Sequence, residues 1–295
     1  MSEQARANLL VDPPSKAAAV ADPKVAPDMS AKVGSSTTGA LSNWLEVNRS
    51  LVDREISFNH TVCFSSEVDF SRVEEVRSAA SAEGWRPSYT TFVAKAVALA
   101  LREFPYANRR LVPRWLPFLR KRLQTFEHCD LTVACERDVP DCAVATFIDV
   151  IRDVDRMPLA EIHAWLSALA RATPENNAQW RAFSGVIQKF PAWLAKILVT
   201  LPVFVPRLWS KYRGGSVLIS SPAKYGVDSV VGAWASPLGV SFGLIKKRAV
   251  VVDGCVEARP TCNLMLNFDR RVMAGAQAAR FFHRIVELLE TVPFA

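Results

Sequence analysis

The clearest pattern of apolar and polar residues lies near the C-terminus of the chain. Leu264, Leu266 and Phe268 stand at alternate positions, which predicts a buried β-strand. A polar loop follows, and Gly275 opens a segment in which apolar residues recur at helical spacing, at positions 278, 281, 282, 285, 288 and 289. We therefore expect a strand, a loop and a helix in succession, an arrangement well suited to presenting a reactive side chain.

Similar patterns divide the rest of the chain into further elements. Helices are expected at 42–56, from Ser71 onward, and at 88–104, 158–172 and 176–189. Strands are expected at 58–64, 126–136, 142–150, 215–221 and 238–245, with a hairpin at 249–257. This order of helices and strands predicts an α+β sandwich in which helices cover a largely mixed sheet.

Three local signals mark element boundaries. Ser71 and Glu74 have the spacing of a capping box, which predicts a helix start. Pro105 lacks an amide hydrogen, so the helix at 88–104 should end before it. The dipeptide Asp253-Gly254 predicts a tight hairpin turn.

Composition indicates how the chain is divided. Residues 1–40 are rich in Ala, Pro, Ser and Lys and contain few large apolar side chains, so we expect a disordered tail. Residues 41–295 are expected to form one domain, because a chain of 295 residues with 50% hydrophobic content can bury a substantial core. The N-terminus lacks the apolar run of a secretory signal, which predicts a cytoplasmic location.

Charge and cysteine content restrict the classes of partner. The net charge of +7 and pI of about 9.2 favour acidic partners such as CoA phosphates, an acidic carrier protein or an anionic membrane surface. No nucleic-acid-binding motif accompanies the charge, so no nucleic-acid partner is expected. Residues 108–122 carry six positive charges and no negative one, which suits either a phosphate or carrier-protein dock or a solvated basic loop. The six cysteines include no Cys-x-x-Cys pair, which disfavours a metal site and a disulfide framework.

A seven-residue motif, Asp-Arg-Arg-Val-Met-Ala-Gly at 269–275, follows the C-terminal strand. It resembles the Asp-His-Arg-x-x-Asp-Gly signature of the dihydrolipoamide acyltransferases of 2-oxo-acid dehydrogenase complexes, which are related to chloramphenicol acetyltransferase. Asp269, Arg271 and Gly275 match the signature. Arg270 replaces the catalytic histidine, and Ala274 replaces the second aspartate, which in the family helps to hold the loop.

The resemblance covers residues 44–290 and is strongest to the stand-alone bacterial members, which lack a lipoyl domain. Beyond the motif it rests on three segments, at 87–108, 214–221 and 237–246. It implies a chloramphenicol-acetyltransferase-like α+β fold and a homotrimer with a channel at each subunit interface. CoA or acyl-CoA is the implied cofactor.

The resemblance also implies roles for the site residues. In the family the motif histidine takes the proton from the acceptor, and a serine on an earlier strand donates a hydrogen bond to the oxyanion of the tetrahedral intermediate. The matching serine here is Ser220, with Ser221 as the alternative. Arg270 stays protonated at any working pH and so cannot act as a general base, although a guanidinium binds phosphate or carboxylate and stabilises an oxyanion. Among the four histidines, His128 is the best candidate for a replacement base.

Residues 190–209 form a nearly continuous apolar segment that departs from the dehydrogenase-complex enzymes. Its lysine, its arginine and its three prolines disfavour a membrane span. Trp193 and Trp209 near its ends would suit helices that lie at a membrane interface. We favour a third interpretation, a helical insertion near 176–213 that packs over the acyl or acceptor channel or at a subunit contact.

The leading hypothesis is a member of this acyltransferase family whose channel for a CoA or pantetheine thioester persists but whose catalysis is impaired or repurposed. One alternative is an active biosynthetic enzyme that transfers an acyl group from CoA or a carrier protein to a thiol acceptor. Another is a non-catalytic protein that assembles with an active paralogue, or that contacts a membrane through residues 190–213.

Overall fold

A computed structural model describes most of the chain beyond its first 41 residues. The described residues are 42–44, 46–47, 60–113, 122–139, 142–232 and 234–294. The tail expected at 1–40 and most of the helix expected at 42–56 lie outside them, although residues 43–44 and 46–47 are helical. The described residues from Ser42 onward belong to one compact unit.

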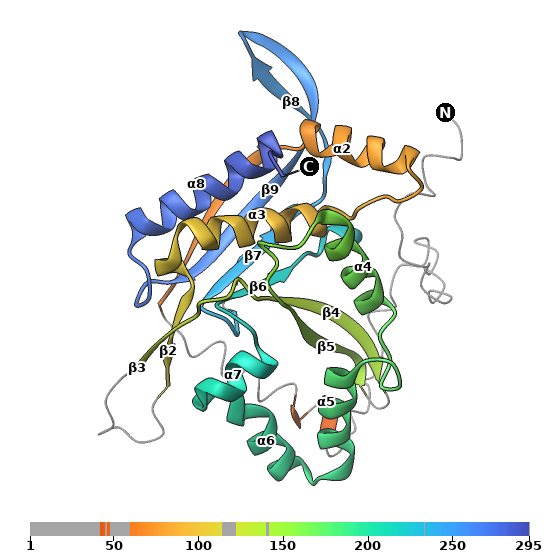
Figure 1. Ribbon diagram of the computed structural model, residues 1–295, viewed down its shortest axis with the longest axis vertical. Coiled ribbons are helices and arrows are strands. Elements are labelled where there is room, and N and C mark those ends of the chain that lie inside the picture. Colours follow the sequence, from red (N-terminus) through yellow and green to blue (C-terminus); the bar gives the residue numbers. More distant parts are fainter. Residues whose placement is uncertain are drawn as a thin grey trace, which may run out of the picture. The chain divides into compact units, whose positions relative to one another are not determined.

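A seven-stranded mixed sheet forms the centre of the described part (Figure 1). Its strands are β1 (Thr61–Asp69), β4 (Leu131–Val139), β5 (Cys142–Ile151), β6 (Val217–Ser220), β7 (Leu238–Phe242), β8 (Lys246–Val252) and β9 (Cys255–Asp269). The strand order is β1-β9-β7-β6-β4-β5, and β8 pairs with β9. The β4–β6 and β6–β7 pairs are parallel and the others antiparallel, so the predicted mixed sheet is confirmed.

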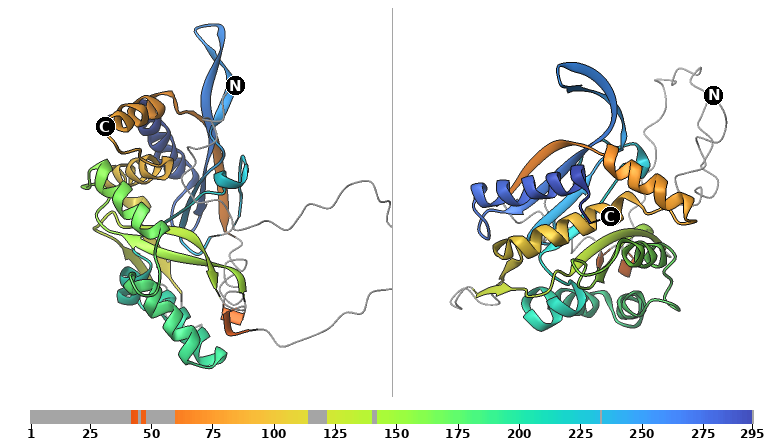
Figure 2. Two further views of the ribbon diagram at one scale, coloured as in Figure 1. Left: turned by 90° about the vertical axis from the view of Figure 1, so that its right-hand side faces the viewer. Right: turned by 45° about the horizontal axis from the view of Figure 1, so that its top comes forward.

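Helices cover the sheet and extend beyond it. They are α2 (Ser71–Ala82), α3 (Tyr89–Glu103), α4 (Leu159–Ala170), α5 (Ala178–Lys189), α6 (Ala192–Phe204), α7 (Pro206–Tyr212) and α8 (Gly275–Thr291). The left view of Figure 2 shows α2, α3 and α8 together on one side of the sheet. A separate hairpin joins β2 (Arg109–Val112) to β3 (Arg122–Thr125). The predicted α+β class, including the helical insertion near 176–213, is therefore confirmed.

The C-terminal pattern produces the expected elements. In α8 all six predicted apolar positions are buried, at 278, 281, 282, 285, 288 and 289. Strand β9 buries Leu264, Leu266 and Phe268 as predicted, but Met265 and Asn267 are buried as well. The loop that precedes β7 covers this second face, where the amide of Val230 lies 3.1 Å from the sulfur of Met265. Alternation alone does not reveal a strand that is covered on both faces.

Two of the predicted boundaries have a backbone cause, and both are confirmed. Helix α3 ends at Glu103, two residues before Pro105. In the hairpin turn, Asp253 and Gly254 both have positive φ, 50° and 82°, as a type I′ turn requires. The resulting β8–β9 hairpin projects from the rest of the sheet (Figure 1).

The helix start predicted at Ser71 is confirmed, but the capping box itself is not formed. Phe70 occupies the N-cap position, and Ser71 is already the first helical residue. Asp69, the last residue of β1, precedes the N-cap, and its Oδ1 accepts a hydrogen bond from the amide of Ser71 at 2.8 Å. Glu74 instead pairs with Arg77, whose Nη1 lies 2.8 Å from Oε1.

Two strand boundaries also differ from the prediction. Strand β1 begins at Thr61 and extends to Asp69, so the expected range 58–64 covers only its first half. Strand β4 begins at Leu131, five residues after the expected start at 126. The amide of Phe126 bonds to the carbonyl of Asn108, so this stretch continues the β2–β3 hairpin before the chain bends into β4.

The apolar segment at 190–209 forms the whole of α6 and the first half of α7. No single helix among the described residues is long and apolar enough to cross a membrane. Taken together, α6 and α7 are long and apolar enough for a membrane span, but the two helices are bent by 101° relative to each other. Pro202 lies inside α6, and Pro206 is the first residue of α7, so the bend coincides with residues that cannot continue a helix.

Candidate active site

Backbone hydrogen bonds hold the motif loop at its β9 end and across its turn. Strand β9 ends at Asp269, whose amide donates to the carbonyl of Pro237 at 2.9 Å. The next amide, of Arg270, donates to the carbonyl of His60 at 2.9 Å. The loop then closes with the amide of Met273 bonded to the carbonyl of Asp269 at 3.3 Å. The frame of the motif is therefore formed although its histidine is replaced.

Two residues of this loop that match the family signature, Asp269 and Arg271, bond to each other, whereas the side chains at the two substituted positions, 270 and 274, form no such contact with the described residues. The Asp269 carboxylate pairs with the Arg271 guanidinium. The Arg270 side chain is exposed, and no hydrogen bond or ion pair joins its guanidinium to the described residues. Ala274 is the N-cap of α8 and has no side-chain acceptor, so only one half of a capping box is present: Gln277 Oε1 accepts from the amide of Ala274 at 3.1 Å.

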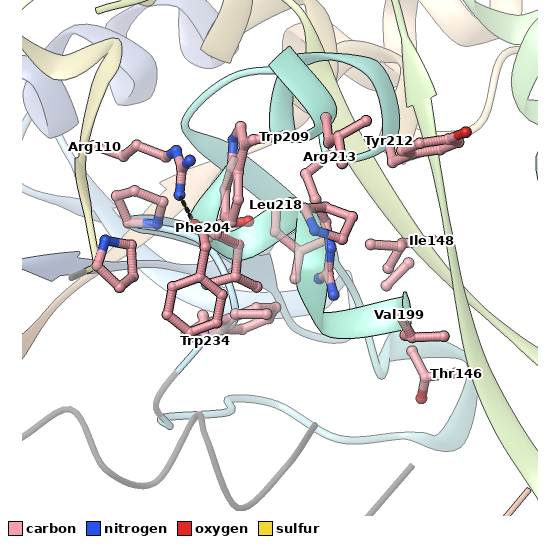
Figure 3. Close-up of a pocket in the computed structure, with 18 of the residues that line it drawn as sticks. Arg110, Thr146, Ile148, Val199, Phe204, Trp209, Tyr212, Arg213, Leu218 and Trp234 are labelled. Carbon is pink, nitrogen blue, oxygen red and sulfur yellow. Dashed lines mark hydrogen bonds between the residues drawn. The ribbon is translucent and has the colours of Figure 1, made fainter. Parts of the chain in front are cut away.

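A large cavity lies between the sheet, the helices α5 to α7 and the motif loop (Figure 3). Its volume is about 1160 Å³. Most of its lining is apolar, and the polar side chains that line it are Thr61, Arg110, Thr146, Gln179, Tyr212, Arg213, Ser220, Trp234, Ser236, Asn267, Asp269 and Arg271. The cavity thus joins Ser220 to part of the motif, while Arg270, Ala274 and Gly275 do not line it.

The structure distinguishes the two candidate serines. Ser221 donates its hydroxyl to the carbonyl of Phe242 at 2.7 Å and accepts from the amide of Ala223 at 3.2 Å, so it serves the turn after β6. Ser220 is the last residue of β6 and lines the cavity. Its hydroxyl has no hydrogen-bond partner among the described residues, which leaves it available to a ligand. We therefore retain Ser220 as the candidate oxyanion donor.

No side chain suited to take a proton at neutral pH lines the described part of the cavity. The titratable residues there are Arg110, Tyr212, Arg213, Asp269 and Arg271, without a histidine, lysine, cysteine or glutamate. The one carboxylate among them is already bonded to a guanidinium. Burial raises the pKa of the thiols of Cys129 and Cys262 to about 12, so neither supplies a thiolate.

The histidines lie elsewhere. His128, the predicted replacement base, is exposed and forms an ion pair with Asp153, with Nδ1 2.7 Å from Oδ1. This hydrogen bond raises the pKa of His128 above its ordinary value. His163 is half-buried beside the ring of Trp85, and burial lowers its pKa. The structure does not bring His128 to the cavity, so its proposed role as a base stays a prediction.

Two further residues shape the cavity and escaped the sequence-based prediction. Trp234 packs directly on Gly239, where an added Cβ would lie 2.4 Å from the indole ring. With its amide oriented to satisfy both partners, Asn267 accepts a hydrogen bond from Trp234 Nε1 at 2.9 Å and donates to the carbonyl of Gly232 at 3.3 Å. Arg110 is a second missed residue; its only sequence signal is its place in the basic segment 108–122.

Among the described residues, no group of three or more histidine, cysteine, aspartate or glutamate side chains is arranged to hold a metal ion. The charged side chains at the cavity are instead mostly guanidinium groups. Such groups bind carboxylates and phosphates, so the site is suited to an anionic ligand.

Known proteins of similar sequence and fold include several acyltransferases. The dihydrolipoyllysine-residue succinyltransferase component of the 2-oxoglutarate dehydrogenase complex of Bartonella vinsonii subsp. berkhoffii is 25% identical over 232 residues, 76% of this chain and 46% of that protein. The cubic core of the pyruvate dehydrogenase multienzyme complex has a similar fold, with a TM-score of 0.65, 21% identity and coverage of 92% of this chain and 98% of that one.

The dihydrolipoamide acetyltransferase of Azotobacter vinelandii gives the same values, a TM-score of 0.65, 21% identity and coverage of 92% and 98%. Its structure concerns a serine, a histidine and an asparagine in the catalytic mechanism. These likenesses confirm the predicted chloramphenicol-acetyltransferase-like fold. The chain spans about half the length of the first curated relatives it matches.

The family model matches most of the chain but not all of it. It covers residues 47–187 and 209–294, and so includes the motif loop and Ser220. The unmatched residues between these two ranges, 188–208, contain the whole of α6. The match extends over more than half of the sequence, and the chain therefore belongs to the family of 2-oxoacid dehydrogenases acyltransferases (catalytic domain).

Proposed function

We propose that this protein binds an acyl thioester of CoA, or of the pantetheine of a carrier protein, and that its transfer chemistry is impaired or repurposed. One observation carries the proposal. The cavity retains an unpartnered serine hydroxyl at Ser220, but its described lining contains no histidine, lysine, cysteine or glutamate, and its one carboxylate, of Asp269, is bonded to Arg271. A donor to the oxyanion is kept while the general base is missing.

The substitutions in the motif support the proposal. In the A. vinelandii enzyme the catalytic histidine and asparagine are four residues apart. Arg270 and Ala274 have this same spacing, which supports placing them at the two corresponding positions of this chain. A guanidinium stays protonated at any working pH, and the alanine methyl group forms no hydrogen bond.

The consequence for rate depends on the acceptor. Loss of a general base costs roughly 10²- to 10⁴-fold in rate. A thiol acceptor is already a few per cent ionised near neutral pH, so slow transfer to a thiol survives this loss. A hydroxyl acceptor is essentially un-ionised, and transfer to it would need another base. We therefore expect residual activity toward dihydrolipoamide or pantetheine and none toward alcohols.

The test is acyl transfer from a panel of acyl-CoA thioesters to dihydrolipoamide and to pantetheine. Wild type is compared with Arg270→His/Ala274→Asp, and Arg280→Ala, an exposed arginine on α8, is the matched control. The proposal predicts slow or silent wild-type transfer and a gain of at least about 100-fold in the double variant. Efficient wild-type turnover that is lost in Arg270→Ala would overturn it and make Arg270 a catalytic residue.

An assembly role is a compatible part of this proposal. The cubic core to which the fold is similar is a multienzyme assembly, which supports an oligomer for this chain, either a homotrimer or a mixed oligomer with an active paralogue. Sedimentation equilibrium of the purified protein tests the homotrimer. To test the mixed oligomer, this protein is tagged and co-expressed with a histidine-bearing homologue, and co-purification of the homologue with the tagged protein is measured. A strictly monomeric protein in both experiments contradicts the assembly role.

A second candidate function, contact with a membrane surface, has one observation in its favour. The exposed face of α6, together with the last residue before it but one, presents apolar side chains at spacings of three and four, at Phe190, Trp193 and Ile197. Sedimentation with anionic liposomes tests this contact. Binding that is unchanged in Trp193→Ser/Ile197→Ser would exclude this face as the membrane contact.

A further inference from the structure

Arg110 is a buried guanidinium that the described residues leave partly unsatisfied. The residue is only 2% exposed. Its Nε donates to Gln124 Oε1 at 2.8 Å, and its Nη1 donates to the carbonyl of Val203 at 2.9 Å. The guanidinium carbon lies 3.9 Å above the ring of Trp209. Its Nη2 is buried and has no hydrogen-bond partner among the described residues, although Arg110 lines the cavity (Figure 3).

Within the described part of the chain, no acidic side chain forms an ion pair with Arg110. Burial, and after it the neighbouring charges of Arg213 and Arg122, lowers the pKa of Arg110 to about 9, so the side chain is still protonated at neutral pH. Asp269 is the one acidic side chain in the described lining, and it is bonded to Arg271. A buried cation with an unused donor is costly unless an anion meets it.

The rest of the cavity is suited to an apolar group. Helix α6 supplies a continuous apolar wall, formed by Leu198, Val199, Leu201, Pro202, Val203 and Phe204. All six lie in the segment 188–208 that the family model does not match. The volume of about 1160 Å³ exceeds the roughly 300–1,000 Å³ of most small-molecule sites. The apolar wall over the cavity is therefore formed by a segment that the family model does not match.

We propose that the cavity beneath α6 and α7 binds a long-chain fatty acid, with its hydrocarbon chain against α6 and its carboxylate beside the Arg110 guanidinium, where a small rotation of the side chain brings the covered Nη2 to the carboxylate. A carboxylate fits better than a phosphate because one unsatisfied donor group matches a single negative charge. A phosphate has three acceptor oxygens and up to two charges, and would need a larger set of donors.

This inference names the ligand class of the cavity that contains Ser220, and it rests on the proposed function for the link between the bound chain and acyl transfer. The two can fail separately. The transfer assay tests the motif loop and Ser220, whereas the experiment below measures equilibrium binding and requires no turnover.

The first measurement uses the unmodified full chain and isothermal titration calorimetry with four probes: hexadecanoate, hexadecanol, hexadecyl phosphate and acetate, each lipid below its micelle concentration. We expect hexadecanoate to bind at least about 10-fold more tightly than hexadecanol, because a charge-assisted hydrogen bond distinguishes them. Acetate should not bind measurably. Equal affinity for acid and alcohol, or no binding of hexadecanoate, overturns the proposal. Tighter binding of hexadecyl phosphate overturns the assignment to a carboxylate.

Variants then locate the site. Val199→Trp places a large ring in the cavity and should lower hexadecanoate affinity at least about 10-fold. Ile197→Trp makes the same kind of change on the exposed face of α6, and its affinity should stay within about 2-fold of wild type. Arg110→Met should remove the preference for acid over alcohol, with the melting temperature measured to confirm folding. Val199→Trp and Ile197→Trp with equal affinities would place the lipid elsewhere and refute the cavity.

Discussion

Asp269 and Arg271, separated by the substituted Arg270, form a bidentate ion pair at the end of β9. Arg271 Nε lies 2.9 Å from Asp269 Oδ1, and Nη2 lies 2.6 Å from Oδ2. The backbone amide of Arg271 also donates to Oδ1 at 2.9 Å. The pair therefore holds the turn from both the side chain and the backbone, which explains how the motif loop keeps its shape without the family's histidine.

The first prediction concerns this pair. Asp269→Asn keeps the shape of the side chain but removes its charge, and should lower the free energy of unfolding by about 1–2 kcal/mol, because charge-assisted hydrogen bonds are lost at a partly exposed site. Urea denaturation measures the change. Arg270→Ala should stay within about 0.5 kcal/mol of wild type, since its side chain is exposed and unpaired within the described structure. A larger effect at Arg270 than at Asp269 would contradict this account.

The second prediction concerns the start of α8. Ala274 has the extended backbone of an N-cap residue, with φ −73° and ψ 157°, but lacks an acceptor. Ala274→Asp should therefore raise the free energy of unfolding by about 1 kcal/mol, through a cap hydrogen bond and the charge at the helix start. Ala279→Asp, the same change at an exposed position inside α8, should give no gain. Equal effects at the two positions would show that the cap geometry is not responsible.

The third prediction tests the contact that places Trp234. Gly239→Ala would put a methyl group 2.4 Å from the indole ring, so either the ring or β7 must move. We expect a loss of about 1–3 kcal/mol in chemical denaturation. Gly185→Ala in α5 is the matched control, because nothing lies within 4 Å of the added methyl group, and it should stabilise the protein slightly. A neutral Gly239→Ala would mean that the cavity wall is deformable.

The fourth prediction is a pH dependence at His128. The pKa of His128 is raised first by its hydrogen bond to Asp153 and then by the charge of Asp153, with a smaller contribution from Asp130 and an opposing one from Arg156. The protonated imidazole thus stabilises the folded state fully below the ordinary value of 6.5, and this contribution is lost as pH rises through the raised pKa.

Asp153→Asn tests this coupling, and asparagine suits the left-handed backbone at this position, where φ is 47°. An NMR titration should show the pKa of His128 falling toward its ordinary value in the variant. The stability difference between wild type and variant should be larger near about pH 5.5 than near about pH 8. An unchanged His128 titration in the variant would refute the pairing.

Much of the fold could be predicted because its signals are local. The helix α8, the type I′ turn at Asp253-Gly254 and the end of α3 before Pro105 each depend on residues within a few positions of one another. The capping box at Ser71 did not form, because the spacing of two residues does not determine where the preceding strand ends. The spacing was present, but where β1 ended decided that Asp69, and not Ser71, would accept the hydrogen bond.

The candidate site divides in a similar way. The motif and its two substitutions could be recognised from the order of residues alone, and so could Ser220. The choice between Ser220 and Ser221 needed the structure. It depends on the carbonyl of Phe242 on another strand, which accepts a hydrogen bond from the hydroxyl of Ser221 and not from that of Ser220. The apolar segment predicted a helical insertion, but not which of its side chains would face a cavity.

By itself, then, the sequence determined the strand, loop and helix that carry the motif, and the loss of the histidine and aspartate within it. Periodicity and short motifs are sufficient for this, because they report interactions between near neighbours in the chain. Only the tertiary structure decided that Arg110 would be buried against Val203, 93 positions away, with a cavity between α6, α7 and the sheet. The burial of this guanidinium away from the described acidic side chains arises from packing between distant segments, and no local pattern encodes it.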